Sequence, residues 1–311
     1  MKIGVILVTF NRLDKLKVAL SCYDKQEFRP QYVYVVNNHS TDGTDEYLKE
    51  WQAQPSNYAK YVLELPYNSG GAGGFHAGLE AGMKLDADWL WVSDDDAYPK
   101  EDAFQKIADY YKSCDKEDRK KIAALCSTVI NEGEIHYAHR NRVNRTKLKC
   151  KMAPSTPEDY KKEAFEIDVF SYVGTLLRKE ALDKAGLPEK DFFIYCDDQE
   201  HALRVGKTGK ILVVSDSIVV HNTPGFGKKE AFWGDYYFAR NNTIMLKKHF
   251  PARYYLLKAA KAYITKASIL SKNPKNIRKM YDAAYKDAFR NRIGIHETYK
   301  PGWNPKEENE K

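Results

Sequence analysis

Paired cysteines and long apolar runs are both missing from this chain, and each absence excludes a class of protein. No CxxC pair occurs and the number of cysteines is odd, which argues against a disulfide framework and against a zinc site. No stretch reaches the roughly 18 apolar residues that a membrane span needs. The apolar run within residues 1–10 is short and lacks a small-residue cleavage site, so we interpret it as a first strand. We therefore expect a chain that works in a reducing cytoplasm and does not cross a bilayer by itself. The five cysteines are Cys22, Cys114, Cys126, Cys150 and Cys196.

Acidic residues are scarce in one long stretch near the C-terminus. Residues 247–292 carry thirteen Lys or Arg against only Asp282 and Asp287, whereas the whole chain of 311 residues has a formal charge of +7. Overall, 30% of residues are charged and 43% are hydrophobic, which is a globular composition. A basic segment of this kind attracts phosphates, either on nucleic acid or on anionic lipid headgroups.

Compact apolar runs alternate with helical patterns, which is typical of a mostly parallel sheet covered by helices. Strands are predicted at 2–9, 31–36, 59–65, 88–93 and 121–130, and helices at about 12–24, 43–53, 74–84 and 100–112. The stretch 141–162 is interpreted as a long loop. A strand with a short helix (about 166–186), a helix at 197–206 and a strand at 211–220 follow. After a Gly/Pro loop at 222–227, helices are expected at about 231–249 and 252–293, with frayed residues at 301–311.

Three consecutive aspartates, Asp94, Asp95 and Asp96, end the predicted strand at 88–93. Adjacent carboxylates repel each other and resist burial, so they need a cation or hydrogen-bond donors to hold them together. Open α/β sheets collect ligands at the carboxyl ends of their strands, and oxygen ligands suit Mg²⁺ or Mn²⁺. The cluster therefore predicts a divalent-metal site, and a diphosphate is the natural partner of such a metal.

Polar segments also follow the first two predicted strands, at 9–12 and 37–44. Each segment alone is explained as a helix-starting turn, because Asn, Ser, Thr and Asp are preferred N-cap residues. Capping does not explain polar clusters after three strands, so we interpret these segments and the aspartates as one ligand-binding rim.

A glycine-dense segment at 68–78 precedes a predicted helix, which suggests backbone N–H groups that approach a phosphate. The specific fingerprints fail, because no GKS or GKT ends the run and His76 stands where a GxGxxG motif starting at Gly71 needs its last glycine. A dinucleotide-binding or ATPase site is therefore weakly supported. A tight structural turn and a close backbone approach to a nucleotide both remain open.

The acidic segment at 197–204 divides into a structural and a chemical part. Asp197 and Glu200 have the spacing of a capping box with Asp197 as N-cap, and Glu200 can pair with Arg204 one turn later. Asp198 has no such explanation. It follows the aromatic run at 191–196, which can exclude water and raise a carboxyl pKa, so we predict Asp198 as a general base.

A histidine and a tryptophan complete the candidate site. His221 follows the strand at 211–220, and although a lone histidine is more often structural, near a metal it would complete an Asp/His ligand set. Most aromatic residues here are expected in the core. Trp233 and Asp197 are the candidates for contact with an acceptor substrate, the molecule to which a group would be transferred.

In combination, these motifs resemble those of inverting family-2 glycosyltransferases of the GT-A fold, and look closest to the bacterial galactofuranosyltransferase and rhamnosyltransferase branch. The similar segments are 8–12, 35–44, 68–74, 91–99 and 192–200, followed by His221. The resemblance implies an α/β, Rossmann-like GT-A domain at 1–249, with a nucleotide-binding half at about 1–130 and an acceptor-binding half at about 131–249. Residues 250–311 would form a basic helical C-terminal extension.

The resemblance also implies a role for each motif residue. Asp94 and Asp96, with Asp95 between them, match the family's DXD motif, and Asp198 matches the catalytic base. The ligands of Mn²⁺ or Mg²⁺ would be Asp96, His221 and Asp94. The residues implied in donor binding are Thr9, Asn11, Arg12 and Asn38 at the nucleoside, and Asn68 and Gly71 at the diphosphate or sugar. Many relatives carry an aspartate where this chain has Asn37 or Asn38, so weaker discrimination between bases is expected.

The implied reaction moves a sugar from a UDP- or dTDP-linked donor to a hydroxyl of a glycan or polyprenyl-linked acceptor, with inversion, in cell-surface polysaccharide synthesis. UDP-galactofuranose is the favoured donor and dTDP-rhamnose the alternative. The basic extension resembles an anchor to the anionic inner face of the cell membrane, and no nucleic acid is expected as a partner. An inverting glycoside hydrolase is less favoured because a metal-binding aspartate triplet is a poor general acid. A non-catalytic nucleic-acid binder is less favoured because the charge lies outside the motif-bearing domain.

Overall fold

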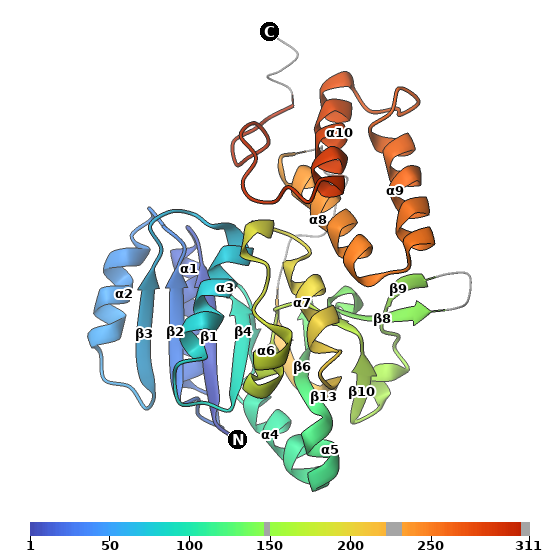
Figure 1. The fold of residues 1–311 in the computed structure, drawn as a ribbon. Coiled ribbons are helices and arrows are strands. Elements are labelled where there is room, and N and C mark those ends of the chain that lie inside the picture. The colour runs from blue at the N-terminus through green and yellow to red at the C-terminus, as the bar shows by residue number, and fades with distance from the viewer. Residues whose placement is uncertain (146–149, 222–231, 306–311) are drawn as a thin grey trace.

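The computed structural model describes residues 1–145, 150–221 and 232–305. A ten-stranded sheet runs through it, and its main strands are ordered β10-β13-β6-β12-β4-β1-β2-β3, with β5 and β7 paired at its side. Helices cover both faces of this sheet (Figure 1). The strands are β1 (Ile3–Thr9), β2 (Tyr32–Asn37), β3 (Ala59–Glu64), β4 (Trp89–Asp94), β5 (Tyr98–Pro99), β6 (Ile122–Asn131), β7 (Glu134–Ile135), β10 (Ala164–Ile167), β12 (Thr175–Arg178) and β13 (Lys210–Val220).

The expected mostly parallel sheet is confirmed in the part that carries the motifs. Pairs β1–β2, β1–β4, β2–β3 and β6–β13 are parallel, whereas β12 runs antiparallel to β4 and β6. The covering helices are α1 (Leu13–Asp24), α2 (Thr44–Ala53), α3 (Gly70–Gly82), α4 (Ala103–Ser113), α5 (Lys116–Lys121), α6 (Lys179–Ala185) and α7 (Asp197–Val205).

Alternation along β1 explains how one strand serves two cores. All seven of its residues are buried, as expected for a central strand covered on both faces. Ile6 and Val8 join the apolar cluster that contains residues of α3. Val5 and Leu7 point the other way and join the cluster that contains residues of α1 and α4.

The glycines of α3 allow that helix to lie directly on the sheet. A Cβ added at Gly74 would come 2.6 Å from Val8, one at Gly78 would come 2.5 Å from Ile6, and one at Gly82 would come 2.8 Å from the same isoleucine. These glycines recur every fourth residue and therefore share one helix face. The helix starts at Gly70, earlier than the predicted residue 74, because the glycine run belongs to the helix and not to a loop before it.

The stretch at 141–162 contains strands, so the prediction of a long loop is wrong. β8 (Arg140–Arg145) pairs antiparallel with β9 (Cys150–Pro154) and with β11 (Val169–Phe170), forming a small second sheet. Arg140 is fully buried and donates to the carbonyl oxygens of Ser127 at 3.0 Å and Val173 at 2.6 Å. These acceptors lie outside the stretch at 141–162. Because its folding depends on contacts with distant residues, the basic composition of the stretch did not reveal its strands.

Three helices follow the sheet: α8 (Gly234–His249), α9 (Ala252–Lys266) and α10 (Lys275–Phe289). Residues of α8 and α10 share an apolar cluster that includes Tyr236, Tyr237 and Tyr281. The Tyr236 hydroxyl also donates to Asp287 at 2.7 Å. The basic helical C-terminal extension is therefore present and packs on α8, and the division of the chain at residue 249 stays a prediction.

Residues 301–305 are folded onto α8 and α10, so the expectation that the chain frays from Pro301 is wrong for them. Tyr299 is buried and stacks on Tyr236 with ring centroids 5.5 Å apart, and Trp303 packs edge-on against Tyr299. Residues 306–311 and the predicted loop at 222–227 lie outside the described residues. Within the described ranges, the chain has no helix with the length and apolarity of a membrane span.

Candidate active site

Polar residues that follow different strands meet at one edge of the sheet, where the carboxyl ends of β1, β2 and β4 lie side by side. They surround a cavity of about 400 Å³ whose apolar walls include Phe10, Phe193 and Ile194. Eight residues predicted from the sequence line it: Thr9, Arg12, Asn38, Asn68, Gly71, Asp94, Asp95 and Trp233. Part of the expected ligand-binding rim therefore lines one cavity, whereas the other predicted site residues are not among its lining: Asn11, Asp96, Asp197, Asp198 and His221.

Cationic and hydroxyl donors hold the aspartate cluster together. Thr9 Oγ1 donates to Asp95 at 2.8 Å. Arg12 Nη1 lies 3.3 Å from Asp95 Oδ1 and 2.9 Å from Asp96 Oδ2, and Lys15 Nζ reaches the same Asp96 oxygen at 2.9 Å. Adjacent buried carboxylates require such donors. Lys15 was not predicted, although it lies one helical turn after the Arg12 segment.

Asp94, Asp96 and His221 offer ligand atoms that all lie within 4.8 Å of one another. His221 Nε2 lies 3.1 Å from Asp96 Oδ1, whereas its Nδ1 is buried with no hydrogen-bond partner in the described part of the chain. Burial tends to raise the pKa of Asp96, yet hydrogen bonds from His221 and Lys15 hold that pKa well below the usual carboxyl range. Burial and then the charge of Asp96 raise the pKa of Asp94 to about 7.

Two carboxylates and an imidazole with one unpartnered nitrogen fit a divalent ion. Oxygen ligands suit Mg²⁺ and Mn²⁺, and Mn²⁺ also accepts imidazole. A cation would also relieve the repulsion between Asp94 and Asp96. These three residues are therefore the candidate metal ligands, as the sequence predicted, and their role stays a prediction.

Asn38 braces the segment that leads into α3. Its Oδ1 accepts from both the backbone N and the Oγ of Ser69 at 2.9 Å. Its Nδ2 donates to Asn68 Oδ1 at 3.2 Å and to the Gly70 carbonyl at 3.0 Å. Because an amide oxygen has two lone pairs, both acceptor positions of Asn38 are used. Direct pairing of this oxygen with a base would need one of these bonds to be exchanged.

Asn11 connects two loops at the rim and does not contribute to the lining described for the cavity. It is exposed, with a φ of 51°, and its Oδ1 accepts from the backbone N of Thr41 at 2.7 Å. Its own backbone N donates to Ser40 Oγ at 3.0 Å. These contacts fix the loop after β1 relative to the loop after β2, so any role of Asn11 toward a nucleoside would include this positioning.

Gly71 differs from the packed glycines of α3. A Cβ added there would meet nothing within 4 Å, and the residue lines the cavity at the first turn of the helix. Backbone N–H groups at a helix start favour anions. The sequence left open whether the glycine run forms a tight structural turn or approaches a nucleotide. Gly74, Gly78 and Gly82 have a structural role in packing α3 on the sheet, whereas Gly71 faces open space at the cavity.

A loop in left-handed backbone conformation precedes the second acidic pair. Phe193, Tyr195 and Cys196 have φ values of 66°, 67° and 65°, which are uncommon for residues with a side chain. Cys196 is the N-cap residue and α7 begins at Asp197, so the prediction of Asp197 as N-cap is wrong. The tight loop brings the chain into the helix one residue earlier than the capping-box spacing suggested.

Among the residues that the structure describes, no cation contacts the second acidic pair, Asp197 and Asp198, as Arg12 contacts the first cluster. Burial raises the pKa of Asp197 to about 6. Burial and then the charge of Asp197 hold the pKa of Asp198 well above the usual carboxyl range, and the charge of Asp94 adds to this effect. Asp198 Oδ1 accepts a hydrogen bond from the Gln199 backbone N at 2.7 Å. The effect of the Asp94 charge on Asp198 indicates that the two acidic groups lie in the same region of the molecule.

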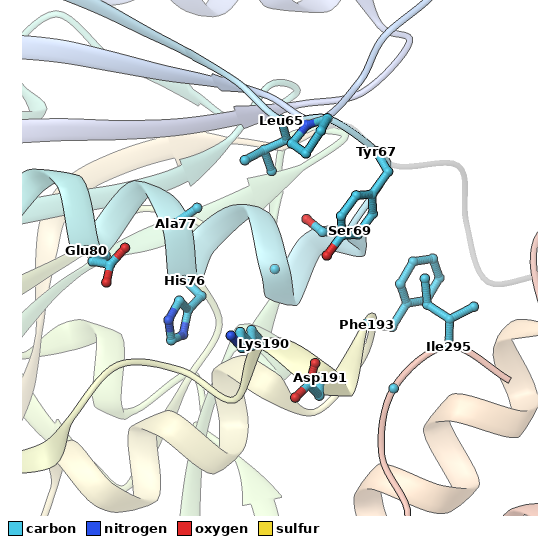
Figure 2. A pocket seen from close by; sticks show the side chains of 13 residues that line it. Leu65, Tyr67, Ser69, His76, Ala77, Glu80, Lys190, Asp191, Phe193 and Ile295 are labelled. Atoms are coloured by element: carbon cyan, nitrogen blue, oxygen red, sulfur yellow. The ribbon is translucent and has the colours of Figure 1, made fainter.

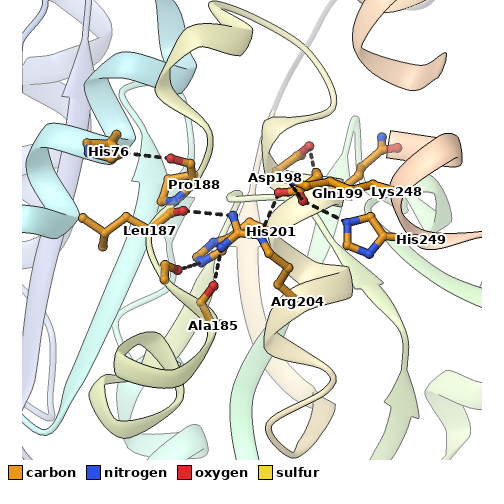
Figure 3. A network of polar contacts seen from close by, with 12 residues as sticks. His76, Ala185, Leu187, Pro188, Asp198, Gln199, His201, Arg204, Lys248 and His249 are labelled. Atoms are coloured by element: carbon orange, nitrogen blue, oxygen red, sulfur yellow. Dashed lines mark hydrogen bonds and ion pairs between the residues drawn. The ribbon is translucent and has the colours of Figure 1, made fainter. Parts of the chain in front are cut away.

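Glu200 anchors α7, which fixes the position of Asp198. Arg204 Nε donates to Glu200 Oε2 at 2.9 Å, which confirms the predicted pair. Lys248 and His249, at the end of α8, approach Glu200 Oε1 at 3.0 Å and 2.8 Å (Figure 3). Burial opposes ionisation, but the bond from His249 and the charge of Arg204 hold the pKa of Glu200 well below its ordinary value.

Arg240 and Asn241 on α8 were missed by sequence reasoning, although both are fully buried. Asn241 Nδ2 lies 2.9 Å from the carbonyl oxygens of Phe192 and Ile194 and 3.0 Å from that of Tyr195. Arg240 Nη2 donates to the Phe192 carbonyl at 3.2 Å. The two side chains therefore hold the left-handed loop before Asp197. Their only sequence signal is a polar pair inside an otherwise aromatic helix.

Two further histidines near the candidate metal ligands were also missed. His139 Nε2 lies 3.1 Å from His136 Nδ1, and the ring of His139 stands 5.5 Å from that of His221. Burial, then the charge of Arg140, lowers the pKa of His139 to about 2, so its ring is neutral. The ring of His139 therefore packs edge-on against the ring of His221.

A second cavity, of about 540 Å³, opens on the outer side of α3, and none of the predicted site residues lines it. His76 and Glu80 of α3 face Lys190 and Asp191 across it (Figure 2). Phe193 lines both cavities and so separates them. Because this second cavity lacks the acidic cluster, the smaller one is the better candidate for catalysis.

The chain belongs to glycosyl transferase family 2, whose sequence profile matches residues 4–186. It is 24% identical to galactofuranosyltransferase GlfT1 of Mycolicibacterium smegmatis over 205 residues, which is 66% of this chain and 65% of that protein. It is 27% identical to GlfT1 of Mycobacterium tuberculosis over 206 residues, 66% of this chain and 64% of that protein. The chain thus spans a little under two thirds of these relatives.

Solved structures show the same fold. The S. aureus TarS 1-349 structure in complex with UDP-GlcNAc matches with a TM-score of 0.60 at 16% identity. The match covers 93% of this chain and 81% of the TarS chain. Mannosyltransferase PcManGT from Pyrobaculum calidifontis, in complex with GDP-Man and Mn2+, matches with a TM-score of 0.55 at 17% identity. The match covers 93% of this chain and 75% of the PcManGT chain. The GT-A fold expected from the motifs is thereby confirmed.

Proposed function

We propose that this chain transfers a sugar from a nucleotide-sugar donor to a hydroxyl group, with inversion and with the help of a divalent metal ion. The observation that carries the proposal is the convergence of Asp94, Asp96 and His221 beside a cavity that also presents Thr9 and Gly71. Family membership supports transfer of a glycosyl group. The nucleotide-sugar complexes of the structural neighbours support the class of donor.

Donor binding is assigned to the sheet side of the cavity. Thr9, Arg12 and Asn38 would position the nucleoside, with Asn11 holding their loops in place. Asn68 and Gly71 would face the diphosphate or the sugar, because they lie at the start of α3, where the backbone favours anions. Asp95 would act mainly by orienting Arg12 and Thr9, to which it is bound.

Asp94, Asp96 and His221 would hold the metal ion, Mn²⁺ or Mg²⁺. When bound there, such an ion neutralises negative charge on a diphosphate. Arg12 and Lys15, both within 2.9 Å of Asp96, would keep this carboxylate ionised and fixed in place.

Asp198 would serve as the general base. It would take a proton from the acceptor hydroxyl, and the resulting oxygen would form a bond to the anomeric carbon while the bond to the departing nucleoside diphosphate breaks. One base and no enzymic nucleophile give inversion. Burial and the charge of Asp197 shift the pKa of Asp198 upward, which is the direction that strengthens a carboxylate as a base. Trp233 lines the same cavity as Asp94, and Asp197 is adjacent to Asp198, so these two residues are the proposed acceptor contacts.

The proposed donor is UDP-galactofuranose, because the similar proteins of both mycobacterial species are galactofuranosyltransferases. The alternative donor is dTDP-rhamnose. Calorimetry with UDP-galactofuranose, UDP-galactose, UDP-glucose and dTDP-rhamnose, each with Mn²⁺ and then with EDTA, tests both the donor and the metal. Binding of UDP-galactofuranose that disappears in EDTA supports the proposal. Equal binding and turnover in EDTA would overturn the metal site.

A polyprenyl-linked glycan is the proposed acceptor, in cell-surface polysaccharide synthesis. Such acceptors reside at a membrane, and the thirteen Lys and Arg of residues 247–292 would attract the anionic inner face of the cell membrane. The proposed organisation is a catalytic domain at 1–249 with a membrane-facing extension at 250–311. Transfer to a synthetic prenyl-linked glycan, compared with the same glycan without lipid, tests this assignment.

A further inference from the structure

The turn between α9 and α10 exposes two aliphatic side chains to an unusual degree. Ile269 is 88% exposed and Leu270 is 77% exposed, the highest values for large apolar residues in the described part of the chain. Neighbouring apolar side chains that stay in water forgo the free energy that burial would supply. Contiguous exposure of this kind marks a contact surface.

The turn is held in shape, so the exposure belongs to a defined structure. The backbone N of Ser268 donates to the Tyr263 carbonyl at 3.0 Å, and Ser268 Oγ donates to the Ile264 carbonyl at 2.8 Å. Ser271 Oγ donates to the Thr265 carbonyl at 2.8 Å. The two hydroxyls fold the turn back onto the end of α9, which leaves the aliphatic pair at the tip.

The apolar surface continues from the tip along α9. Leu257 is 73% exposed, and Leu256 and Ile264 are 48% and 49% exposed. Ala259 is the one residue of α9 that is buried. Leu257 and Ile264 are seven residues apart and so lie on one face of the helix. Together with the tip they form an apolar strip, defined here as Leu256, Leu257, Ile264, Ile269 and Leu270.

Positive charge surrounds this strip. Residues 252–281 contain eight Lys or Arg and no Asp or Glu. Lys258, Lys261 and Lys272 are exposed beside the strip. An apolar face bordered by lysines is the pattern of a helix that lies in the interface of an anionic bilayer.

We propose that the apolar strip inserts into the headgroup region of an anionic lipid bilayer, with Ile269 and Leu270 as its deepest side chains and the flanking lysines at the lipid phosphates. This inference deepens the membrane association of the proposed function, by naming the element that enters the lipid. A second copy of the chain fits poorly, because eight cations would face eight cations. Nucleic acid would meet the lysines but would leave the aliphatic tip in water.

The position of the turn suits a lipid-linked substrate. In Figure 1 the turn lies at the end of the molecule toward which the strands β1, β2 and β4 point their carboxyl ends. Insertion of the turn therefore brings the edge of the sheet that carries the cavity toward the membrane surface.

Vesicle binding of the full chain tests the inference. Sedimentation is measured with vesicles of phosphatidylcholine alone and with vesicles in which about a third of the lipid is anionic phosphatidylglycerol. The wild type is compared with the Ile269→Ser/Leu270→Ser double variant. The matched control is Val18→Ser, an apolar residue 48% exposed on α1. In a Leu270→Trp variant, indole emission and its quenching by brominated lipid report insertion directly.

The expected result is that the double variant binds anionic vesicles at least tenfold more weakly, while Val18→Ser binds like the wild type and Leu270→Trp emission shifts to the blue. Undiminished binding by the double variant overturns the inference, even if vesicle binding itself is confirmed. The inference is also overturned if the wild type does not bind vesicles and the double variant loses self-association instead. Binding of the wild type to nucleic acid but not to lipid would overturn it as well. Nucleotide calorimetry on the same samples shows whether the proposed donor site has failed separately.

Discussion

Asp96 and Asp198 each belong to a run of aspartates, but the two carboxylates have opposite surroundings. Asp96 is contacted by Arg12, Lys15 and His221, which hold its pKa well below the usual carboxyl range. Asp198 has Asp197 as its charged neighbour and accepts a backbone N–H from Gln199, and its pKa is raised. Asp96 is thus arranged to stay charged, as a metal ligand requires, while the pKa of its neighbour Asp94 is raised to about 7, and Asp198 is arranged to take up a proton, as a base requires.

The comparison teaches that the surroundings of a carboxylate carry more functional information than the carboxylate itself. Both carboxylates lie in runs of aspartate in the sequence. Only the contacts of Arg12 and Lys15 on one side, and the tight aromatic loop on the other, separate their roles. The predictions below are ordered by the size of the expected effect.

Removing the proposed base should have the largest effect. Asp198→Asn keeps the shape of the side chain but cannot take a proton, so transfer should fall roughly a thousandfold, the usual contribution of a general base. Donor affinity measured by calorimetry should stay within about twofold. Asp191→Asn, a change at an exposed aspartate just before the same loop, is the matched control. Unchanged turnover in Asp198→Asn would remove this residue from the mechanism.

Removing a proposed metal ligand should act on binding and not only on turnover. We expect Asp96→Asn to weaken Mn²⁺-dependent donor binding by at least the roughly hundredfold loss that follows removal of a group supporting a metal ligand. Arg12 and Lys15 would then lack their common partner. Calorimetry with and without Mn²⁺ measures the effect, and the exposed Asp86→Asn serves as control. If Asp96→Asn keeps metal-dependent donor binding, the proposed role of Asp96 as a metal ligand is wrong.

Loosening the loop before Asp197 should reduce turnover while leaving donor binding largely unchanged. In Asn241→Asp a carboxylate replaces the amide that donates to three loop carbonyls. A displacement of about 1 Å at a catalytic group costs up to roughly a hundredfold in rate, so we expect a loss of ten- to a hundredfold in kcat. Asn242→Asp, one residue along α8 and partly exposed, is the control. Equal losses in both variants, or a loss confined to KM, would argue against positioning.

The smallest expected effect is on stability and depends on pH. Because the folded state raises the pKa of Asp198, it binds this proton more tightly than the unfolded chain does, and stability falls as pH rises above the ordinary carboxyl value of about 4. Asp198→Asn lacks this penalty. Its Tm should therefore exceed that of the wild type at pH 8, and by a smaller margin at pH 5, as thermal unfolding at the two pH values would show. A Tm difference that grows on acidification would have the wrong sign.

Much of the fold was predictable because its signals are local. The strands from β1 to β4 are compact apolar runs, and the polar residues after them are adjacent in sequence to the strand ends. Parallel neighbours place those ends at one edge, so Thr9, Asn38 and Asp94 were expected to meet, and they line one cavity.

What could not be predicted depends on contacts between distant elements. The strands β8 and β9 are held around the buried Arg140, whose acceptors include the carbonyls of Ser127 and Val173. Asn241 acts on carbonyls about 46 to 49 residues earlier in the chain. The capping role given to Asp197 failed for a related reason, because the left-handed φ of Cys196 is imposed by the surrounding structure.

The glycine face of α3 has a consequence for how this chain can vary. A methyl group at Gly78 would overlap Ile6 on β1 and come within 2.9 Å of Val36 on β2. The helix α3 could relieve this overlap only by moving away from the sheet. Its first turn, with Gly71 and the neighbouring Asn68, would move with it. The positions of Gly71 and Asn68 at the cavity thus depend on the three glycines of this face, which do not line it, and variants of the proposed donor site should be sought there as well.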